Sequence, residues 1–515
     1  MKKRTKQIIG TFMTLLLTVL LLSVLTSVTE RKASREKYRD FFTQKEDFDV
    51  LFLGTSHVIN AIYPMELWKD YGIVSYNFGG HGSQIATTYW TLKNALDYTK
   101  PKLVVMDCLS LSSAKKGNDV FSFFHQAFDS FPLTYNKLSA IWDLLDDPGL
   151  DETIANGTAR ESDEPRTKIG LLWNFTVFHS RWNELTEEDF HVPREKEKGA
   201  ESRIHVYSTS LRKIPSDQKS EGDSVGYRYL LKIIKLCKEK GIDLLLTFYP
   251  FPASMGQQMD ANRTYDIAAE YGLNYINFLD LDIVDYKTDC FDESSHLNPS
   301  GARKVTDYIG SYIMSHYPAV ADQRNNPDYA GWFDDYKEYE ALKKENLQSQ
   351  TKLDNYLMLL RDKNIDIIME VNTPELWKTN LYGALLENLG VDLNTLPQDQ
   401  DIYVLTKGGA GAEFYGRKAL FDSTVNVPGL GSLSVRSPEA KDNDSADENK
   451  TEDTYGFWLD DKLLYEAQKS HNDVEDLRVT VLDSKTHEIL DHVTFILALH
   501  ETNGSYNVRV AQTNR

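Results

Sequence analysis

A serine, a histidine and two carboxylates occupy positions in this sequence that suit acyl chemistry. Ser56 follows the segment LFLGT at residues 51–55, an apolar run ended by a glycine turn, and the carboxyl ends of such strands are where open α/β sheets collect ligands. His296 follows Asp292 and Glu293 by four and three residues. A carboxylate at that spacing can hold one ring nitrogen while the other takes a serine proton. We therefore predict a triad of Ser56, His296 and one of the two carboxylates.

A glycine-rich segment, YNFGGHGS at residues 76–83, lies about twenty residues further on, again at the end of an expected strand. Glycines let the backbone approach a ligand closely, so the amides of Gly82 and Ser56 together can hold a developing oxyanion. His81 in the same segment is a candidate substrate contact. The alternative is a plain turn. The dinucleotide-binding pattern GxGxxG with its downstream acid is absent from this segment.

A second group of candidate substrate-binding residues lies in the segment FHSRW, which contains His179, Arg181 and Trp182. An indole ring offers a face on which a sugar can stack, so this group is one candidate for a substrate clamp. The alternative is that Trp182 packs against the protein and Arg181 forms a salt bridge. His57, next to Ser56, would face away from it if Ser56 begins a helix, so we expect a structural or substrate-contacting role for it.

The elements that must position these residues alternate in type between about residues 49 and 315. Short apolar runs predict strands at residues 50–53, 74–78, 103–106, 244–248 and 275–278. Helical patterns cover residues 87–98, 229–240 and 300–312, and Gly72, Gly241 and Gly272 end helices just before strands. Apolar strands separated by helices predict an α/β fold with a flavodoxin-like, doubly wound parallel sheet.

Other parts of the chain interrupt or follow this domain, which we place at residues 31–325. Residues 109–225 read as a partly helical insertion around the site, and residues 326–352 as a helical connector. A second small α/β domain is expected over residues 353–515, with strands at residues 365–371, 402–405, 477–482 and 493–497 and a helix at residues 375–389. The acidic, polar tract at residues 437–453 predicts a flexible loop.

The first 30 residues predict a membrane anchor. Lys2, Lys3, Arg4 and Lys6 precede a run from Ile8 to Val28 that contains no charge, and about 20 apolar residues suffice to cross a bilayer as a helix. Basic residues before the run and mixed charge after it place the N-terminus in the cytoplasm and residues from about 30 onward outside. The protein is thus expected at the cell membrane, single-pass, with its catalytic domain extracellular. The alternative is a cleaved signal peptide, but residues 25–30 offer no good small-x-small site.

The composition excludes some classes of function. The 57 Lys and Arg residues against 77 Asp and Glu give a net charge of −20, and no basic block lies beyond the N-terminus, which argues against a nucleic-acid partner. The three cysteines, Cys108, Cys237 and Cys290, have neither zinc-site nor disulfide-framework spacing and are expected to be buried thiols. No metal or organic cofactor is implied.

The segments LFLGTSH, NFGGHG and DESSHLNPSGA together resemble the first, second and last blocks of the SGNH (GDSL-type) hydrolase superfamily, over roughly residues 45–315. The resemblance implies that Ser56 is the nucleophile, Gly82 an oxyanion donor and His296 the base. The family's acid usually stands three positions before the histidine, which is Glu293 here, with Asp292 beside it. The third block, Gly-x-Asn-Asp, is missing, so one oxyanion donor is unaccounted for.

Within that superfamily the chain most resembles membrane-anchored, exported members that work beside membrane-bound O-acyltransferases, as in alginate acetylation and teichoic-acid D-alanylation. The C-terminal region resembles a circularly permuted FAM3 (interleukin-like EMT inducer) domain, through residues 364–371, 401–409 and 479–495. Such domains are non-catalytic, and related ones bind carbohydrate. The alternative is a structural spacer.

These resemblances imply an exported serine acyltransferase or esterase that acts on O-acyl groups, O-acetyl in the first place, of a cell-surface polysaccharide or teichoic acid. A membrane-bound O-acyltransferase is the expected protein partner. Two alternatives stay open: a carbohydrate esterase that only removes acyl groups, and a catalytically idle glycan-binding scaffold for the acyltransferase.

Overall fold

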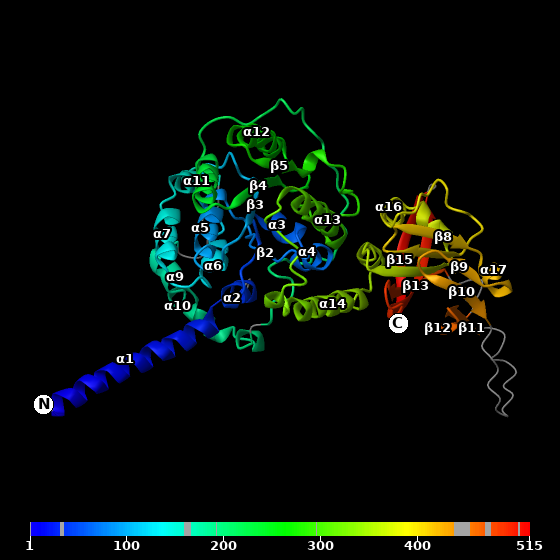
Figure 1. Ribbon diagram of the computed structural model, residues 1–515, viewed down its shortest axis with the longest axis horizontal. Coiled ribbons are helices and arrows are strands. Elements are labelled where there is room, and N and C mark those ends of the chain that lie inside the picture. The colour runs from blue at the N-terminus through cyan, green and yellow to red at the C-terminus, as the bar shows by residue number, and fades with distance from the viewer. Residues whose placement is uncertain are drawn as a thin grey trace. The chain divides into compact units, whose positions relative to one another are not determined.

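The structure, a computed structural model, describes residues 2–30, 35–158, 166–191, 193–294, 296–436, 454–468, 475–502 and 505–515. The chain divides into two compact units (Figure 1). Unit 1 comprises Met1–Ser202, Leu211–Val284 and Ala302–Tyr339, and unit 2 comprises Arg203–Ser210, Asp285–Gly301 and Glu340–Arg515.

Unit 1 is built on a five-stranded sheet whose strands are all parallel. Its members are β1 (Val50–Leu53), β2 (Ser75–Asn77), β3 (Leu103–Asp107), β4 (Asp243–Phe248) and β5 (Asn274–Asn277), in the order β2-β1-β3-β4-β5. This is the doubly wound order of flavodoxin-like sheets. The predicted parallel sheet is confirmed, and each strand lies within a residue or two of its predicted range.

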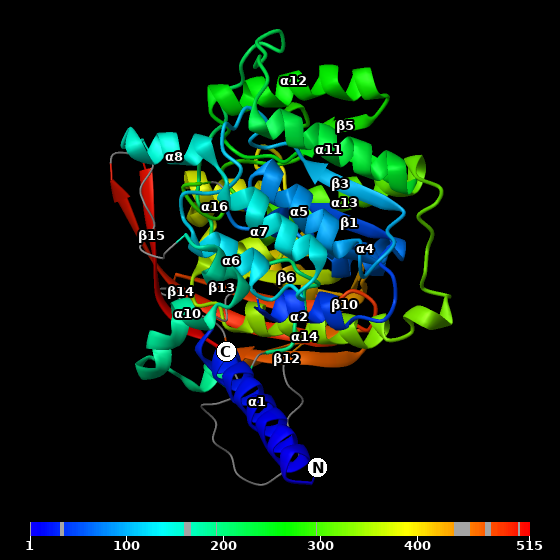
Figure 2. The same ribbon diagram turned by 90° about the vertical axis from the view of Figure 1, so that its left-hand side faces the viewer.

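Helices connect these strands because a parallel strand pair needs a crossover. The connecting helices are α3 (Ser56–Ala61), α4 (Pro64–Tyr71), α5 (Ile85–Ala95), α11 (Val225–Lys240) and α12 (Met255–Tyr271), and α13 (Pro299–His316) follows the last strand. Helices α5 and α11 pack against each other, and their apolar residues share one core with Leu51, Val104 and Met106 of the sheet. On α13, Gly310 lies directly against Tyr71 of α4. Figure 2 shows β1, β3 and β5 of this sheet together with α5, α11 and α12.

Three glycines end helices as the sequence predicts. Gly72, Gly241 and Gly272 follow α4, α11 and α12 with φ values of 68°, 67° and 65°. This left-handed conformation strains residues that carry a Cβ, so glycine stops the helix and turns the chain into the next segment.

The predicted insertion contains short helices in its described part. They are α6 (Ser122–Phe128), α7 (Tyr135–Leu145), α8 (Pro148–Ala155), α9 (Lys168–Leu172), α10 (Phe175–Phe178) and the 3₁₀ turns η1 (His179–Asn183) and η2 (Glu187–Asp189). Residues 201–223 form neither helix nor strand apart from a turn. Further 3₁₀ turns are η3 (Phe278–Asp280) and η4 (Pro327–Tyr329), and the helix α14 (Trp332–Gln348) lies within the predicted connector.

The N-terminal helix α1 (Lys2–Thr29) is followed by α2 (Arg35–Thr43). Within α1 the 26-residue stretch Arg4–Thr29 has a mean hydropathy of 2.5 over its most apolar window and buries none of that window in the protein. It is long enough and apolar enough to cross a membrane.

Unit 2 contains two antiparallel sheets. The larger has the order β15-β14-β13-β6-β7-β8 and the smaller β12-β11-β10-β9. Their strands are β6 (Ile365–Val371), β7 (Ile402–Thr406), β8 (Gly411–Tyr415), β9 (Val425–Val427), β10 (Gly431–Arg436), β11 (Thr454–Leu459), β12 (Lys462–Gln468), β13 (Asp476–Asp483), β14 (Ile489–Thr502) and β15 (Ser505–Asn514). The helical elements are α15 (Leu353–Leu359), η5 (Pro374–Lys378), α16 (Asn380–Asn388) and α17 (Arg417–Asp422).

The two faces of the larger sheet are buried differently. One face shares a core with α15 and α16 through Ile367, Tyr356 and Leu385, and the other faces the smaller sheet through Ile368 and Phe457. The helix expected at residues 375–389 is interrupted at Thr379, whose side chain caps α16. Strands β8 to β12 and β15 were not predicted. The tract at residues 437–453, expected to be a flexible loop, lies outside the described residues.

Candidate active site

Ser56 is the first residue of α3, directly after the carboxyl end of β1. The turn between them needs Gly54, whose φ is +148° and whose added Cβ would lie 2.4 Å from the Cβ of Asp107. Thr55 is the N-cap, because its hydroxyl accepts a hydrogen bond from the His57 N–H at 3.2 Å. Ser56 itself is half-buried. This strand–turn–helix arrangement places the hydroxyl-bearing residue at the edge of the sheet where ligands bind in open α/β folds.

A buried carboxylate, Asp107 at the end of β3, holds this turn from the side. Its Oδ2 accepts the Thr55 hydroxyl at 3.0 Å, and its Oδ1 accepts the Leu109 N–H at 3.2 Å. The residue is 1% exposed. Burial raises the pKa of the Asp107 carboxyl to about 6, although the hydrogen bonds from Leu109 and Thr55 oppose that shift. Asp107 therefore fixes the N-cap of the helix that begins with Ser56.

The glycine loop, Gly79–Gly82, lies against the same turn. The Gly80 N–H donates to the Gly54 carbonyl at 3.0 Å, and a Cβ on Gly79 would lie 2.8 Å from the Thr55 carbonyl oxygen. Gly82 has a φ of +60°, and its Cβ would lie 2.5 Å from Asn118 Nδ2, so a larger residue does not fit. In the part of the chain that the structure describes, the Gly82 N–H donates to no protein acceptor. The loop and turn predicted to form the oxyanion site are thus neighbours.

Polar groups beneath the glycine loop fix its backbone. Lys37 of α2 is 4% exposed and donates through Nζ to the carbonyls of Gly79 and Gly199, each at 2.8 Å. Burial lowers the pKa of this ammonium to about 8, against the attraction of Glu201 and Glu195. Asn118 of the insertion donates to the Gly82 carbonyl at 3.1 Å. Side chains of α2 and of the insertion therefore hold the two ends of the loop, at Gly79 and Gly82.

The predicted base, His296, lies in the loop before α13, and the carboxylate at its Nδ1 is Asp292. The distances from Nδ1 to the two carboxylate oxygens are 2.9 Å and 3.1 Å. The backbone N–H of His296 donates to the same carboxylate at 3.2 Å. Glu293, the position implied by the family spacing, is an exposed residue of the same loop. Hydrogen bonding at Nδ1 favours the tautomer in which Nε2 carries the lone pair, which is the form a general base requires.

Asn298 holds this loop through hydrogen bonds to its backbone. It is fully buried, and its Nδ2 donates to the carbonyls of Thr288, Cys290 and His205. Its Oδ1 accepts the N–H groups of Ser300 and Gly301, which makes it the N-cap of α13, with Pro299 at the first helical position. The start of α13 at Pro299, capped by Asn298, thus fixes the chain just after His296.

The other two histidines near the site have partners in unit 1. His81 Nε2 lies 3.1 Å from Glu201 Oε1, so the glycine loop also carries a histidine–carboxylate pair. The His57 ring stacks on Phe251 at 4.1 Å between ring centroids. The stacking agrees with the structural role expected for His57, since Ser56 does begin a helix.

The proposed substrate clamp in the insertion lies next to the end of α1. Arg181 donates to the carbonyls of Thr29 and Glu30 at 2.8 Å and 2.7 Å and forms a salt bridge with Asp189 at 3.0 Å. His179 Nδ1 lies 3.2 Å from the carbonyls of Phe175 and Thr176. Trp182 is 72% exposed. Arg181 therefore makes the salt bridge of the alternative interpretation, and its role as a substrate contact stays a prediction.

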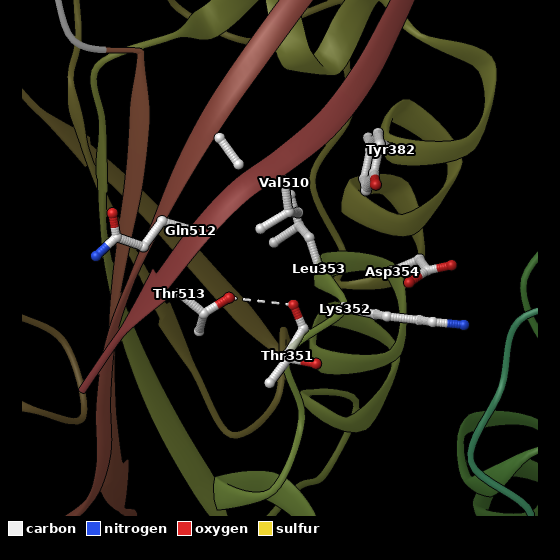
Figure 3. A pocket seen from close by; sticks show the side chains of 9 residues that line it. Thr351, Lys352, Leu353, Asp354, Tyr382, Val510, Gln512 and Thr513 are labelled. Atoms are coloured by element: carbon white, nitrogen blue, oxygen red, sulfur yellow. Dashed lines mark hydrogen bonds between the residues drawn. The ribbon is translucent and has the colours of Figure 1, made fainter.

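A cavity of about 520 Å³ lies within unit 2 (Figure 3). The described residues that line it include none of the predicted site residues; they are Thr351, Lys352, Leu353, Asp354, Tyr382, Val510, Ala511, Gln512 and Thr513. Across it the Thr513 hydroxyl donates to the Thr351 carbonyl at 3.1 Å. Over the described ranges, no group of three or more His, Cys, Asp or Glu residues is arranged to hold a metal ion. All three cysteines are buried free thiols, as predicted.

The structure thus brings the predicted residues together in two groups. The first group, in unit 1, joins Ser56, Gly82 and His81 through the turn after β1 and the glycine loop. The second, in unit 2, joins Asp292 to His296. The pairing of Ser56 with His296 joins residues of the two units and stays a prediction. Chemically, the first group offers a hydroxyl and backbone N–H donors, and the second offers an oriented imidazole.

Sequence reasoning missed Asp107, Lys37 and Asn118. Asp107 had a usable signal, because a carboxylate at the carboxyl end of a buried parallel strand must be paired or neutralised. Lys37 and Asn118 had none, since their partners are backbone carbonyls far away in the sequence.

Comparisons with known proteins give a limited result. No protein-family model and no curated protein matches this sequence. Among solved structures, a "putative acylhydrolase" from Bacteroides fragilis is similar over 54% of this chain and 94% of its own, with 10% identity and a TM-score of 0.26. A GDSL-like lipase from Bacteroides thetaiotaomicron is similar over 55% and 98%, with 10% identity and a TM-score of 0.25. At these scores the likeness assigns neither a fold nor an activity to this chain.

Proposed function

We propose that this protein is an exported, membrane-anchored serine acyltransferase or esterase of the SGNH type that acts on O-acyl groups of a cell-surface polysaccharide. The observation that carries the proposal is the Asp292–His296 pair at 2.9 Å, on the loop that opens α13. The half-buried serine at the carboxyl end of β1 supports it, since the two together supply the parts of a serine nucleophile system.

In the proposed mechanism, His296 Nε2 takes the Ser56 proton as Oγ attacks the carbonyl carbon of an acyl ester. The resulting oxyanion is held by the N–H groups of Gly82 and Ser56. His296 then gives its proton to the leaving alkoxide, which departs as an alcohol and leaves an acyl-serine. In the second half the histidine removes a proton from a sugar hydroxyl or from water, which attacks the acyl-serine and regenerates Ser56.

Transfer and hydrolysis differ only in the attacking hydroxyl. Transfer requires the acceptor sugar to be positioned better than water. The resemblance to exported proteins of polysaccharide acylation supports transfer, and the apolar helix α1 with its basic start supports attachment to the outer side of the cell membrane.

The test uses the full chain with p-nitrophenyl acetate as acyl donor, with and without oligosaccharide acceptors. Acetylated sugar as the main product supports transfer, and free acetate without regard to acceptor supports the esterase. The Ser56→Ala variant is expected to lose both products, while Ser315→Ala, at an exposed serine of α13, keeps them. Full turnover by Ser56→Ala would remove Ser56 as the nucleophile, and no turnover by the folded wild type would overturn the enzyme proposal and leave the scaffold alternative.

A further inference from the structure

The insertion contacts the C-terminal end of the apolar helix α1 through several side chains. The Trp173 indole N–H donates to the Thr26 hydroxyl at 3.1 Å, and Asn174 Nδ2 donates to the Glu30 carboxylate at 2.9 Å. Arg181 donates to the carbonyls of Thr29 and Glu30, at the C-terminal end of the helix. Both α10 and η1 contact α1, and α10 lies beside the end of α1 in Figures 1 and 2.

The level of these contacts can be compared with the thickness of a bilayer. The uncharged run of α1 begins at Ile8, and a hydrocarbon core takes about 20 helical residues, so the run leaves the core near Ser27. Trp173 contacts Thr26, and Arg181 contacts Thr29. The insertion therefore meets α1 at the headgroup level and not in the aqueous space beyond it.

Large apolar side chains are exposed on this same part of the insertion. We define the juxtamembrane surface as Ile169, Trp173, Trp182 and Phe190, which are 65%, 41%, 72% and 60% exposed. Each contacts the end of α1 or belongs to a segment next to it. Trp173 contacts it directly, Trp182 belongs to η1, and Phe190 follows Asp189, the partner of Arg181. Ile169 is on α9, which packs on α10.

We infer that the juxtamembrane surface docks into the interfacial layer of the bilayer that α1 crosses, so that unit 1 rests on the membrane. Tryptophan is favoured at this depth because its ring is apolar while its N–H needs a polar partner. Four large apolar side chains around the exit point of a membrane helix would otherwise be exposed to water. The occupant is therefore lipid, continuous with the lipid around α1.

The charges of this segment indicate how the docking works. Residues 166–191 contain three cations against four carboxylates; these are Arg166, Lys168 and Arg181, and Glu184, Glu187, Glu188 and Asp189. Attraction to anionic lipid needs clustered basic residues, which this segment lacks. This segment therefore contributes apolar burial, and we expect docking on neutral phosphatidylcholine and at high salt.

The native thiols make a site-specific test possible, because Cys108, Cys237 and Cys290 are all buried. The full chain is prepared with Trp182→Cys on the juxtamembrane surface, Met255→Cys at an exposed position of α12, or Leu16→Cys inside α1. Each thiol is labelled with the fluorophore NBD, and the protein is reconstituted into phosphatidylcholine nanodiscs. Quenching is measured with a shallow lipid spin label, a deep lipid spin label and aqueous iodide.

The label at residue 182 is expected to be quenched by the shallow spin label and to lose its quenching by iodide. The label at residue 255 is expected to show the reverse, and the label at residue 16 to be quenched by the deep spin label. A label at residue 182 that behaves like the one at residue 255 overturns the inference. So does protection at residue 182 seen only in native membranes, since the occupant would then be a protein.

This inference requires that α1 spans the membrane and does not require the Ser56 chemistry. If the label at residue 16 is not quenched by the deep spin label, α1 does not span the membrane and the inference is wrong. The same pattern is expected when Ser56→Ala is added, so loss of catalysis and loss of docking are separate results.

Discussion

Asp107, at the end of β3 beside the turn after β1, and Asp292, in the loop before α13, are two carboxylates with different surroundings. Asp107 is 1% exposed and accepts hydrogen bonds from the Thr55 hydroxyl and the Leu109 N–H. The Asp292 side chain is 34% exposed and contacts the ring of His296. A carboxylate bonded to fixed donors frames the backbone, whereas one bonded to a titratable ring can stabilise a charge that appears during a reaction. The comparison supports a structural role for Asp107, and under the proposed function it gives Asp292 the role of the acid that stabilises His296.

The largest effect is expected from His296→Ala, which removes the ring that Asp292 serves. Because general acid–base catalysis contributes up to about 10⁴-fold, the kcat/KM for p-nitrophenyl acetate should fall by about that factor. His316→Ala, at an exposed histidine of α13, is the matched control and should change nothing. An undiminished rate in His296→Ala would remove the chemical role from the loop before α13.

Asp292→Asn tests whether Asp292 is the carboxylate that assists His296. The amide cannot stabilise the imidazolium, so we expect kcat to fall by about 1,000-fold with little change in KM. Glu293→Gln is the control, since Glu293 is the exposed neighbour on the same loop. A larger loss in Glu293→Gln than in Asp292→Asn would transfer the role of the acid to Glu293.

Asp107→Asn tests the structural side through the pH dependence of stability. The carboxyl has a pKa of about 6 in the folded protein against an ordinary 3.8, so the folded state holds its proton more tightly than the unfolded state. The free energy of unfolding of the wild type should therefore fall as pH rises from about 4 to about 6, by up to about 3 kcal/mol from this group.

The variant should lack that part of the fall, which urea titrations of both proteins between pH 4 and pH 7 would measure. Asp243→Asn, at an exposed aspartate at the start of β4, should keep the wild-type dependence. Parallel stability curves for wild type and Asp107→Asn would mean that Asp107 is not the desolvated group.

The smallest effect is expected from Thr55→Ala, which removes the N-cap of α3 and one partner of Asp107. Loss of an N-cap side chain costs about 1 kcal/mol in the free energy of unfolding. Thr134→Ala, which removes the same kind of cap from α7, gives the reference value. If Asp107 supports the turn as described, Thr55→Ala should also lower the acylation rate of Ser56, whereas Thr134→Ala should not.

Local patterns were enough to predict the parallel sheet and the helix ends. The apolar runs predicted the strands of unit 1 because β1, β2 and β3 are buried throughout. Gly72 predicted a helix end because its left-handed φ of 68° suits glycine. The spacing of Asp292 and Glu293 before His296 predicted a carboxylate contact and left the choice open. The choice depends on the path of the loop, which spacing alone does not define.

Contacts between distant segments could not be predicted in this way. Thr55 and Asp107 are 52 residues apart, and Trp173 lies 147 residues from Thr26. No periodicity connects such pairs, since they follow from how the strands and the insertion pack. In the smaller sheet of unit 2, β9 has only three residues and β12, with the sequence KLLYEAQ, is only partly apolar, so neither has a strong alternating pattern.

The central claim is that Ser56 is a nucleophile activated by His296, and labelling with a fluorophosphonate tests it most directly. The full chain is treated with the reagent, and the adduct is located by peptide mass spectrometry in the wild type, Ser56→Ala, His296→Ala and His316→Ala. We expect one adduct, on Ser56, formed at equal rates in the wild type and His316→Ala and lost in the other two variants. An unlabelled Ser56 in the folded wild type, or labelling of Ser56 in His296→Ala at the wild-type rate, would contradict the account.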